Sequence, residues 1–329
     1  MILAGYGFAF PFESEFMAWL QSFLGLNGIK FISLFSFAGA ELTAVFFGFL
    51  YWSYDKKMGK YVGLNILMAL VWHPMIKNVV MRRRPYFDHE DIDIYLPPDS
   101  NADIYDISAQ GYSFPSGHSS NAVSFFGSAA AYDITNAEDA ARKKKRAGII
   151  AAVVISFLVG FSRVTVGAHY PTDVLCGWLL GIAVIFLIPR LRSFFGSTPK
   201  LYAFLLAVSL PGMFYCTSAD YYTAMGALMG FMAGTLFEER FVQFENTRNP
   251  LFSFLRVAIG LAIYFALNAI LKLPFSREFL HSGVHAALIV RCLRYAIVSF
   301  ICFGVYPMSF RFLTEKHDQS QIEEERKGE

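Results

Sequence analysis

Long apolar segments recur along the whole chain, and they most constrain what it can fold into. A helix needs about 20 predominantly apolar residues to cross the hydrocarbon core of a bilayer. Only 16% of the residues are charged, against about 25% in soluble domains. We therefore expect an all-α fold, a polytopic membrane helix bundle. By this rule the sequence predicts about nine spans: 31–54, 61–81, 117–132, 147–161, 174–188, 201–216, 222–237, 251–271 and 284–312.

The segment before the first span has a different pattern. Apolar residues recur at helical spacing between Glu13 and Leu26, with charge at the start, and they are Phe16, Trp19, Leu20, Phe23 and Leu24. This pattern predicts an amphipathic helix at the membrane interface, within an N-terminal segment 1–29. The first residues lack the basic region and cleavage site of a secretory signal peptide, so we expect the first span to direct the chain into the membrane.

Lys and Arg residues predict the orientation of the spans. They cluster in the connections between spans one and two, three and four, and five and six: Lys56, Lys57 and Lys60, then Arg142 to Arg146, then Arg190, Arg192 and Lys200. By the positive-inside rule these connections face the cytoplasm, as does the charged tail 314–329. The net charge of +2 is too small to indicate a nucleic-acid partner. The opposite helix ends should face the extracytoplasmic side.

The first motif at that opposite face is Lys77-x6-Arg84-Pro85. Lys77 and Arg84 are about two helical turns apart, so both can project from one face at the end of the second span. Pro85 stops the helix. Arg82 and Arg83, which lie between these two residues in the sequence, are expected to extend their long side chains to the lipid–water interface. Lys77 lies deeper in the span.

The second motif, Pro115-Ser116-Gly117-His118, opens the third span. A helix N-terminus presents free N–H groups to an anion, and Gly117 permits close approach of the backbone. His118 in the first turn can protonate a leaving oxygen. The alternative is that Ser116 is an ordinary helix cap and His118 an interfacial residue.

The third motif is Ser162-Arg163-x5-His169-x3-Asp173, which joins the fourth and fifth spans. A neutral imidazole is a good nucleophile toward phosphorus, and a carboxylate four residues later can fix its tautomer. Arg163 offers a planar fork for two phosphoryl oxygens. A simple Asp cap with an interfacial His is the alternative, but it explains neither Arg163 nor the other two motifs.

Other polar residues are candidates for the pocket. Glu41 lies inside the first span, where ionisable groups are costly; it either pairs with a motif cation or contacts substrate, or it is structural. His73, one turn before Lys77, lines the pocket or packs in the core, and Ser162 adjoins Arg163.

Two further features concern the rest of the chain. The acidic segment 86–114 is either a cap over the site or an external loop. The four cysteines lack the spacing of a metal site.

Together the motifs K-x6-RP, PSGH and SR-x5-H-x3-D resemble the type 2 phosphatidic acid phosphatase (PAP2) superfamily, over roughly residues 30–217. The resemblance implies a six-span catalytic core over 30–217, additional transmembrane helices over 218–313, and no metal or cofactor. It also implies that His169 becomes phosphorylated, that Asp173 orients it and that His118 protonates the leaving group. The phosphoryl oxygens would be held by Lys77, Arg84, Ser116, Gly117 and Arg163.

The expected function is that of an integral phosphatase of the plasma or inner membrane. It would hydrolyse a lipid phosphate or a polyprenyl diphosphate, the latter slightly favoured, at the extracytoplasmic face of the bilayer. One alternative is a lipid phosphotransferase, in which an alcohol replaces water as the acceptor. Another is a non-catalytic lipid-phosphate binder or transporter, although anion binding alone requires neither His118 nor the His169–Asp173 pair.

Overall fold

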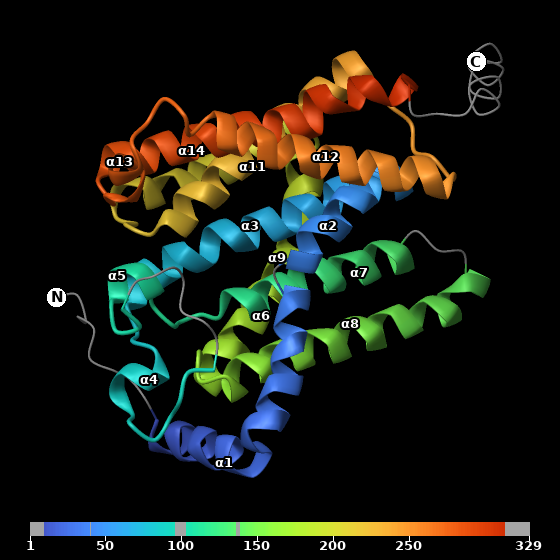
Figure 1. Ribbon diagram of the computed structural model, residues 1–329. Helices are drawn as coiled ribbons and strands as arrows, with labels where there is room; N and C mark the ends of the chain where they lie inside the picture. Colours follow the sequence, from blue (N-terminus) through green and yellow to red (C-terminus); the bar gives the residue numbers. More distant parts are fainter. Residues whose placement is uncertain (1–9, 40, 96–102, 136–138, 313–329) are drawn as a thin grey trace. The chain divides into compact units, whose positions relative to one another are not determined.

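The computed structural model describes residues 10–39, 41–95, 103–135 and 139–312, and every regular element in those ranges is a helix (Figure 1). This confirms the all-α prediction. The charged tail 314–329 and residues 1–9 lie outside the described residues. In chain order the α-helices and the short 3₁₀ or π-helical elements (η) are α1 (Pro11–Ser33), η1 (Leu34–Gly39), α2 (Glu41–Phe49), η2 (Leu50–Tyr54), α3 (Lys56–Val80), α4 (Pro85–Asp88), α5 (Ile107–Gln110), α6 (Gly117–Ala122), η3 (Val123–Gly127), α7 (Ser128–Thr135), α8 (Asp139–Thr165), α9 (Pro171–Phe195), α10 (Thr198–Ser209), η4 (Leu210–Phe214), α11 (Ala219–Phe237), η5 (Glu238–Val242), α12 (Pro250–Ile270), α13 (Arg277–His281), α14 (His285–Phe300), η6 (Ile301–Val305) and η7 (Tyr306–Phe312).

Six helical stretches among the described residues are long and apolar enough to cross a membrane. They are Pro11–Tyr54, Lys56–Asp88, Arg146–Thr165, Pro171–Phe195, Pro250–Ile270 and His285–Phe312. Three further segments that the sequence predicts as spans, 117–132, 201–216 and 222–237, are helical but shorter or less apolar than these six.

The first of these stretches is longer than one crossing requires. Pro11–Tyr54 contains 44 residues, about twice the length that spans a bilayer. Gly25 has non-helical angles (φ 58°, ψ 175°) inside α1, and Figure 1 shows that α1 changes direction along its length. Glycine tolerates this left-handed φ because it has no Cβ. The bend separates the predicted interfacial segment from the apolar run that follows.

The chain divides into two compact units, and the first contains all three motifs. It comprises Met1–Ala44 and Tyr61–Met225. Its packing joins the N-terminal half of α1 to the loop that connects α8 and α9, through a buried apolar cluster of Met17, Leu20, Ile92, Val164, Tyr170 and Val174. The loop that carries His169 is therefore built against α1 as well as between its own two helices.

The second unit comprises Val45–Lys60 and Gly226–Glu329. Aromatic rings pack together inside it: Phe47, Tyr51 and Phe231 each contact the ring of Phe303. Glycines four residues apart on α11 let this helix approach the backbone of α14, because a Cβ on Gly230 would clash with the carbonyl oxygen of Ala296. Such small-residue stripes allow close helix packing in membranes.

Candidate active site

The structure places the motif residues at helix ends of the first unit. Lys77 lies in the last turn of α3, His118 in the first turn of α6, and Arg163 in the last turn of α8. His169 is in the short α8–α9 connection and Asp173 is in the first turn of α9. The motif residues therefore come from four different helices and one connection between helices.

His169 and Asp173 are buried next to each other. The Nδ1 atom of His169 lies 3.6 Å from Oδ2 of Asp173, which is longer than the 2.7–3.2 Å of an ordinary hydrogen bond. The same Oδ2 accepts the backbone N–H of Tyr170 at 2.9 Å. Catalytic hydrogen bonds are often long in the absence of substrate and shorten when it binds. The imidazole and the carboxylate are therefore neighbours, but the hydrogen bond between them is not formed in this structure.

The motif cations act electrostatically on His169. Burial lowers the pKa of His169 well below its ordinary value of 6.5, and the positive charges of Arg84, Lys77 and Arg163 lower it further. The imidazole is therefore neutral over the physiological range, which is the form that can attack phosphorus. The same cations would attract the oxygens of a phosphate group.

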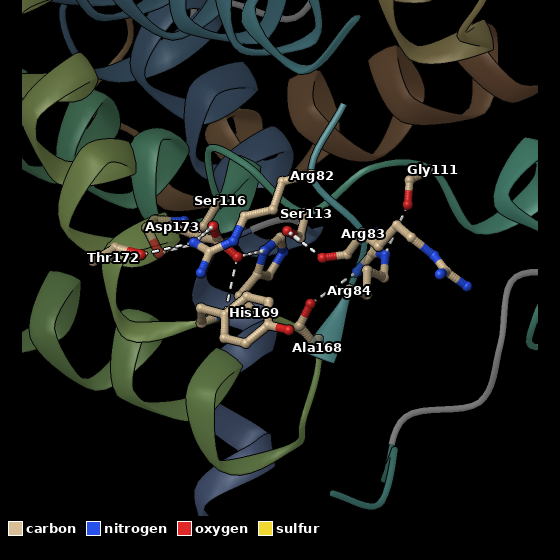
Figure 2. A network of polar contacts seen from close by, with 12 residues as sticks. Arg82, Arg83, Arg84, Gly111, Ser113, Ser116, Ala168, His169, Thr172 and Asp173 are labelled. Atoms are coloured by element: carbon tan, nitrogen blue, oxygen red, sulfur yellow. Dashed lines mark hydrogen bonds and ion pairs between the residues drawn. The ribbon is translucent and has the colours of Figure 1, made fainter. Parts of the chain in front are cut away.

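Arg84 is held by backbone carbonyls from two segments of the chain. Its Nε donates to the oxygens of Gln110 and Gly111, each at 3.1 Å, and its Nη2 donates to Gln110 at 2.7 Å. Its Nη1 donates to the oxygen of Ala168, next to His169, at 3.3 Å (Figure 2). The end of the acidic 86–114 segment thus contacts the site, while its residues 96–102 lie outside the described part of the chain.

The second motif is fixed to the third through the backbone. The N–H of Ser116 donates to the carbonyl oxygen of Asp173 at 2.9 Å, and a Cβ on Gly177 would lie 2.5 Å from the carbonyl oxygen of Ser116. Helices α6 and α9 therefore pack backbone to backbone. The Ser116 hydroxyl caps α6 by accepting from Ser119, N–H at 3.4 Å and Oγ at 2.9 Å.

The remaining predicted pocket residues occupy different positions. His73 is buried and packs on the second motif, because a Cβ on Gly117 would lie 2.9 Å from its Nε2. Ser162 contacts the Val159 carbonyl oxygen at 2.7 Å and the Ser36 hydroxyl at 2.9 Å, which holds α8 against η1. Glu41 begins α2, and its side chain lies outside the described part of the structure.

Arg82 is buried in the protein instead of reaching the membrane surface. The expectation that it reaches the lipid–water interface is wrong, because its side chain is only 1% exposed. Its guanidinium contacts Asp173 and Thr172, each at 2.7 Å (Figure 2), and lies 3.8 Å from the ring centroid of Tyr170. Arg83, at 33% side-chain exposure, pairs with Asp88 at 2.8 Å.

The local backbone explains why Arg82 turns inward. Helix α3 ends at Val80, before Arg84 and the stop predicted at Pro85, which instead begins α4. Met81 adopts a left-handed φ of 53° while its N–H donates to the Lys77 carbonyl oxygen at 2.9 Å. This is the geometry of a left-handed helix cap, which redirects the chain. A run of arginines at a helix end gives no sign of such a cap when the capping residue is not glycine.

Two regions of the chain match known protein families. Residues 58–197 match the PAP2 superfamily, and residues 222–317 match the family described as PAP2 superfamily phosphatase, transmembrane extension. No solved structure matches the chain.

Individual relatives match parts of the chain. Phosphatidylglycerophosphatase B of Bacillus subtilis is 44% identical over 77 residues, 23% of this chain and 37% of the relative. Undecaprenyl-diphosphatase of Sulfolobus acidocaldarius is 30% identical over 138 residues, 42% of this chain and 57% of the relative. Lipid phosphate phosphatase delta of Arabidopsis thaliana is 25% identical over 243 residues, 68% of this chain and 56% of the relative.

The chain thus spans less than two thirds of the length of each of these relatives. The two family matches nevertheless cover both the motif-bearing helices and the helices that follow them. Together with the six apolar helical stretches, they identify the chain as a multi-pass membrane protein of the PAP2 superfamily, with a PAP2 domain followed by the transmembrane extension.

Proposed function

We propose that this protein is a membrane phosphatase that hydrolyses a lipid phosphate monoester or diphosphate through a phosphohistidine intermediate. The observation that carries the proposal is the placement of His169. Its imidazole is buried and lies 3.6 Å from Asp173, and burial together with the charges of Arg84, Lys77 and Arg163 lowers its pKa. A site for simple anion binding requires the cations but not the nucleophile and its carboxylate.

The first chemical step transfers the phosphoryl group to His169. The Nε2 lone pair attacks phosphorus, and the bond from phosphorus to the leaving oxygen breaks. His118, which becomes protonated when the negatively charged phosphate binds beside it, donates its proton to that oxygen, so the lipid leaves as an alcohol or as a lipid monophosphate. Asp173 stabilises the positive charge that develops on the imidazole, while Lys77, Arg84 and Arg163 stabilise the charge on the equatorial phosphoryl oxygens.

The second step returns the enzyme to its starting state. A water molecule attacks the phosphohistidine, the N–P bond breaks and inorganic phosphate leaves. The now neutral His118 accepts the proton of that water, so its protonation state is restored. Ser116 and Gly117, at the start of α6, complete the proposed cradle for the phosphoryl oxygens.

The proposed substrate is a lipid because the site adjoins helices that cross the bilayer. The apolar chains would lie in the membrane while the phosphate reaches the polar helix ends. Relatives named for phosphatidylglycerophosphate and undecaprenyl diphosphate support both a monoester and a diphosphate as candidates. The positive-inside pattern of the sequence supports an extracytoplasmic active site.

Phosphate release by detergent-purified protein tests the proposal. Wild type and His169→Ala would be compared in EDTA on phosphatidylglycerol phosphate, undecaprenyl diphosphate, phosphatidic acid and a sphingoid-base phosphate. Release by wild type alone is the expected result. Equal release by a folded His169→Ala protein would overturn the histidine mechanism. Transfer to an added alcohol in place of hydrolysis would identify a phosphotransferase.

A further inference from the structure

A carboxylate from the N-terminal helix is buried beside the proposed catalytic pair. Glu13 in the first turn of α1 has no exposed surface. Its Oε1 accepts the N–H and the hydroxyl of Thr172, at 2.9 and 2.7 Å, and its Oε2 accepts from Nη2 of Arg82 at 2.7 Å. Thr172 directly precedes Asp173, so Glu13 holds the first turn of α9.

Arg82 connects Glu13 to Asp173. Its Nη1 donates to Oδ1 of Asp173 at 2.7 Å, and its Nη2 binds Glu13. This leaves Oδ2, the oxygen nearer to His169, on the other side of the carboxylate. The ring of Tyr170 covers the guanidinium at 3.8 Å. The guanidinium at Oδ1 and the Tyr170 N–H at Oδ2 together fix the rotation of the Asp173 carboxylate that faces the imidazole.

The net charge of Glu13, Arg82 and Asp173 also affects the His169 imidazole. An arginine paired with Asp173 alone would neutralise that carboxylate and weaken it as an acceptor for the imidazole N–H. Because Glu13 shares the same guanidinium, the three groups carry a net charge of −1 when both carboxylates are ionised. That residual charge stabilises the positive imidazole formed on phosphorylation, and more strongly in a buried site than in water.

A second contact ties α1 to the opposite side of the same loop. The Nε2 of Gln21 donates to the carbonyl oxygens of Asp93 and Thr165, at 2.8 and 3.0 Å, and its Oε1 accepts the N–H of Asp93 at 3.1 Å. Glu13 and Gln21 therefore bind on both sides of the segment that contains His169. Both lie outside the 58–197 region that matches the PAP2 domain.

We propose that Glu13 is a positioning residue of the active site, which acts through Arg82 to orient Asp173 and to keep its charge available to His169. Helix α1 then contributes a positioning residue to the active site in addition to being an N-terminal membrane segment. The inference rests on the proposed function only for the roles of His169 and Asp173; the contacts of Glu13 are independent of it.

The test compares Glu13→Gln with Glu15→Gln, since Glu15 is exposed on the same helix. Glutamine keeps the shape of Glu13 but removes its charge. We expect kcat of Glu13→Gln to fall about 10- to 100-fold, as for a small misplacement of a catalytic group, with KM changed less than about twofold. Glu13→Asp, which retains the charge, should be closer to wild type, and Glu15→Gln should equal wild type.

A double-mutant cycle distinguishes positioning from a merely structural role. If Glu13 acts through Asp173, Glu13→Gln should have no further effect on kcat in an Asp173→Asn background. The inference would be overturned by the same loss of kcat in both backgrounds, or by unchanged kcat in Glu13→Gln. A lower thermal unfolding temperature with unchanged kcat would also overturn it, because Glu13 would then only stabilise the fold.

A readout that requires no turnover separates this inference from the proposed function. In protein labelled with ¹⁵N-histidine, the imidazole signals of His169 can be assigned by their loss in His169→Ala. We expect Glu13→Gln to shift these signals and Glu15→Gln to leave them in place. A wild type that releases no phosphate from any lipid would contradict the proposed function, and the signals would still decide the role of Glu13: unshifted signals would overturn it.

Discussion

The Nδ1 atom of His169 lies 3.6 Å from Oδ2 of Asp173, a carboxylate whose other oxygen is held by Arg82. A small rotation of either side chain would bring the two atoms to hydrogen-bond distance. Sequence spacing alone predicts that the two residues are neighbours, but one of the two contacts that orient the carboxylate comes from Arg82, 91 positions earlier in the chain; the other comes from the nearby Tyr170 N–H.

Asp173→Asn should remove most of the proposed activity. The amide keeps the size of the side chain but cannot stabilise the imidazolium, and it presents a donor or a neutral acceptor to both His169 and Arg82. Loss of the equivalent orienting carboxylate in a hydrolytic triad costs about 10,000-fold in kcat. Steady-state phosphate release checks this prediction, with the thermal unfolding temperature as the control for folding. A kcat within tenfold of wild type would contradict the orienting role.

Stability should fall in acid partly because of His169. The pKa of its imidazole is lowered in the folded protein from 6.5, so above about pH 6.5 it is neutral in both the folded and the unfolded state. As pH falls below that value the unfolded state binds a proton that the folded state does not, and the free energy of unfolding decreases.

His169→Gln removes this contribution. The apparent unfolding temperature of the variant in detergent should therefore decrease less between pH 7.5 and pH 5.5 than that of wild type. An equal decrease in the two proteins would show that the imidazole takes up its proton in the folded state as readily as in the unfolded chain.

Gly177→Ala should disturb the contact between α6 and α9. A Cβ there would lie 2.5 Å from the carbonyl oxygen of Ser116, so the helices must move apart. Overpacking of this kind costs about 1–3 kcal/mol. Gly148→Ala in α8 is the matched control, because a Cβ at Gly148 meets nothing within 4 Å. Thermal unfolding and phosphate release should both be impaired in Gly177→Ala alone; equal stability of the two variants would contradict the close packing.

Arg84→Lys should lower kcat/KM by about 10- to 1,000-fold, as for loss of one transition-state donor. Lysine retains the charge but cannot contact Gln110, Gly111 and Ala168 together, as Arg84 does. Arg83→Lys is the control, because Arg83 is partly exposed and pairs with Asp88. Kinetics on the preferred lipid would check this, and similar values for both variants would remove Arg84 from the proposed phosphate site.

The proposed side of the membrane can be tested with cysteine labelling. In a Cys176→Ala background, Tyr105→Cys should react with a membrane-impermeant maleimide in intact cells, since Tyr105 is exposed and its ring packs on Phe87, three residues after Arg84. Lys57→Cys, in a predicted cytoplasmic connection, should react only after permeabilisation. The reverse pattern would place the active site on the cytoplasmic side.

Helical character and family could be read from the sequence because both depend on local signals. Apolar runs predict helices, and the confirmed all-α fold follows from them. Motif spacing places Lys77 and His118 at helix ends and His169 between two helices, where the structure also has them. These predictions require no knowledge of contacts between distant segments.

The role of Glu13 required such knowledge. Periodicity groups Phe16, Trp19 and Phe23 with Leu20 as one apolar set, yet Leu20 is buried while the three aromatic residues are exposed. A membrane-protein helix can be apolar on the side that faces lipid and polar on the side that faces protein, so hydropathy does not tell which side packs inward. The partner that makes a buried Glu13 favourable, Arg82, is 69 residues away.

The anchoring of Arg84 affects the thermodynamics of binding. A flexible arginine loses conformational freedom when a ligand immobilises it, at a cost of about 0.5–1.5 kcal/mol. The carbonyl oxygens of Gln110, Gly111 and Ala168 already fix this side chain, so that entropy is lost once, during folding. A phosphate group that binds at Arg84 therefore meets a preorganised partner, and its affinity is not reduced by the ordering of that residue.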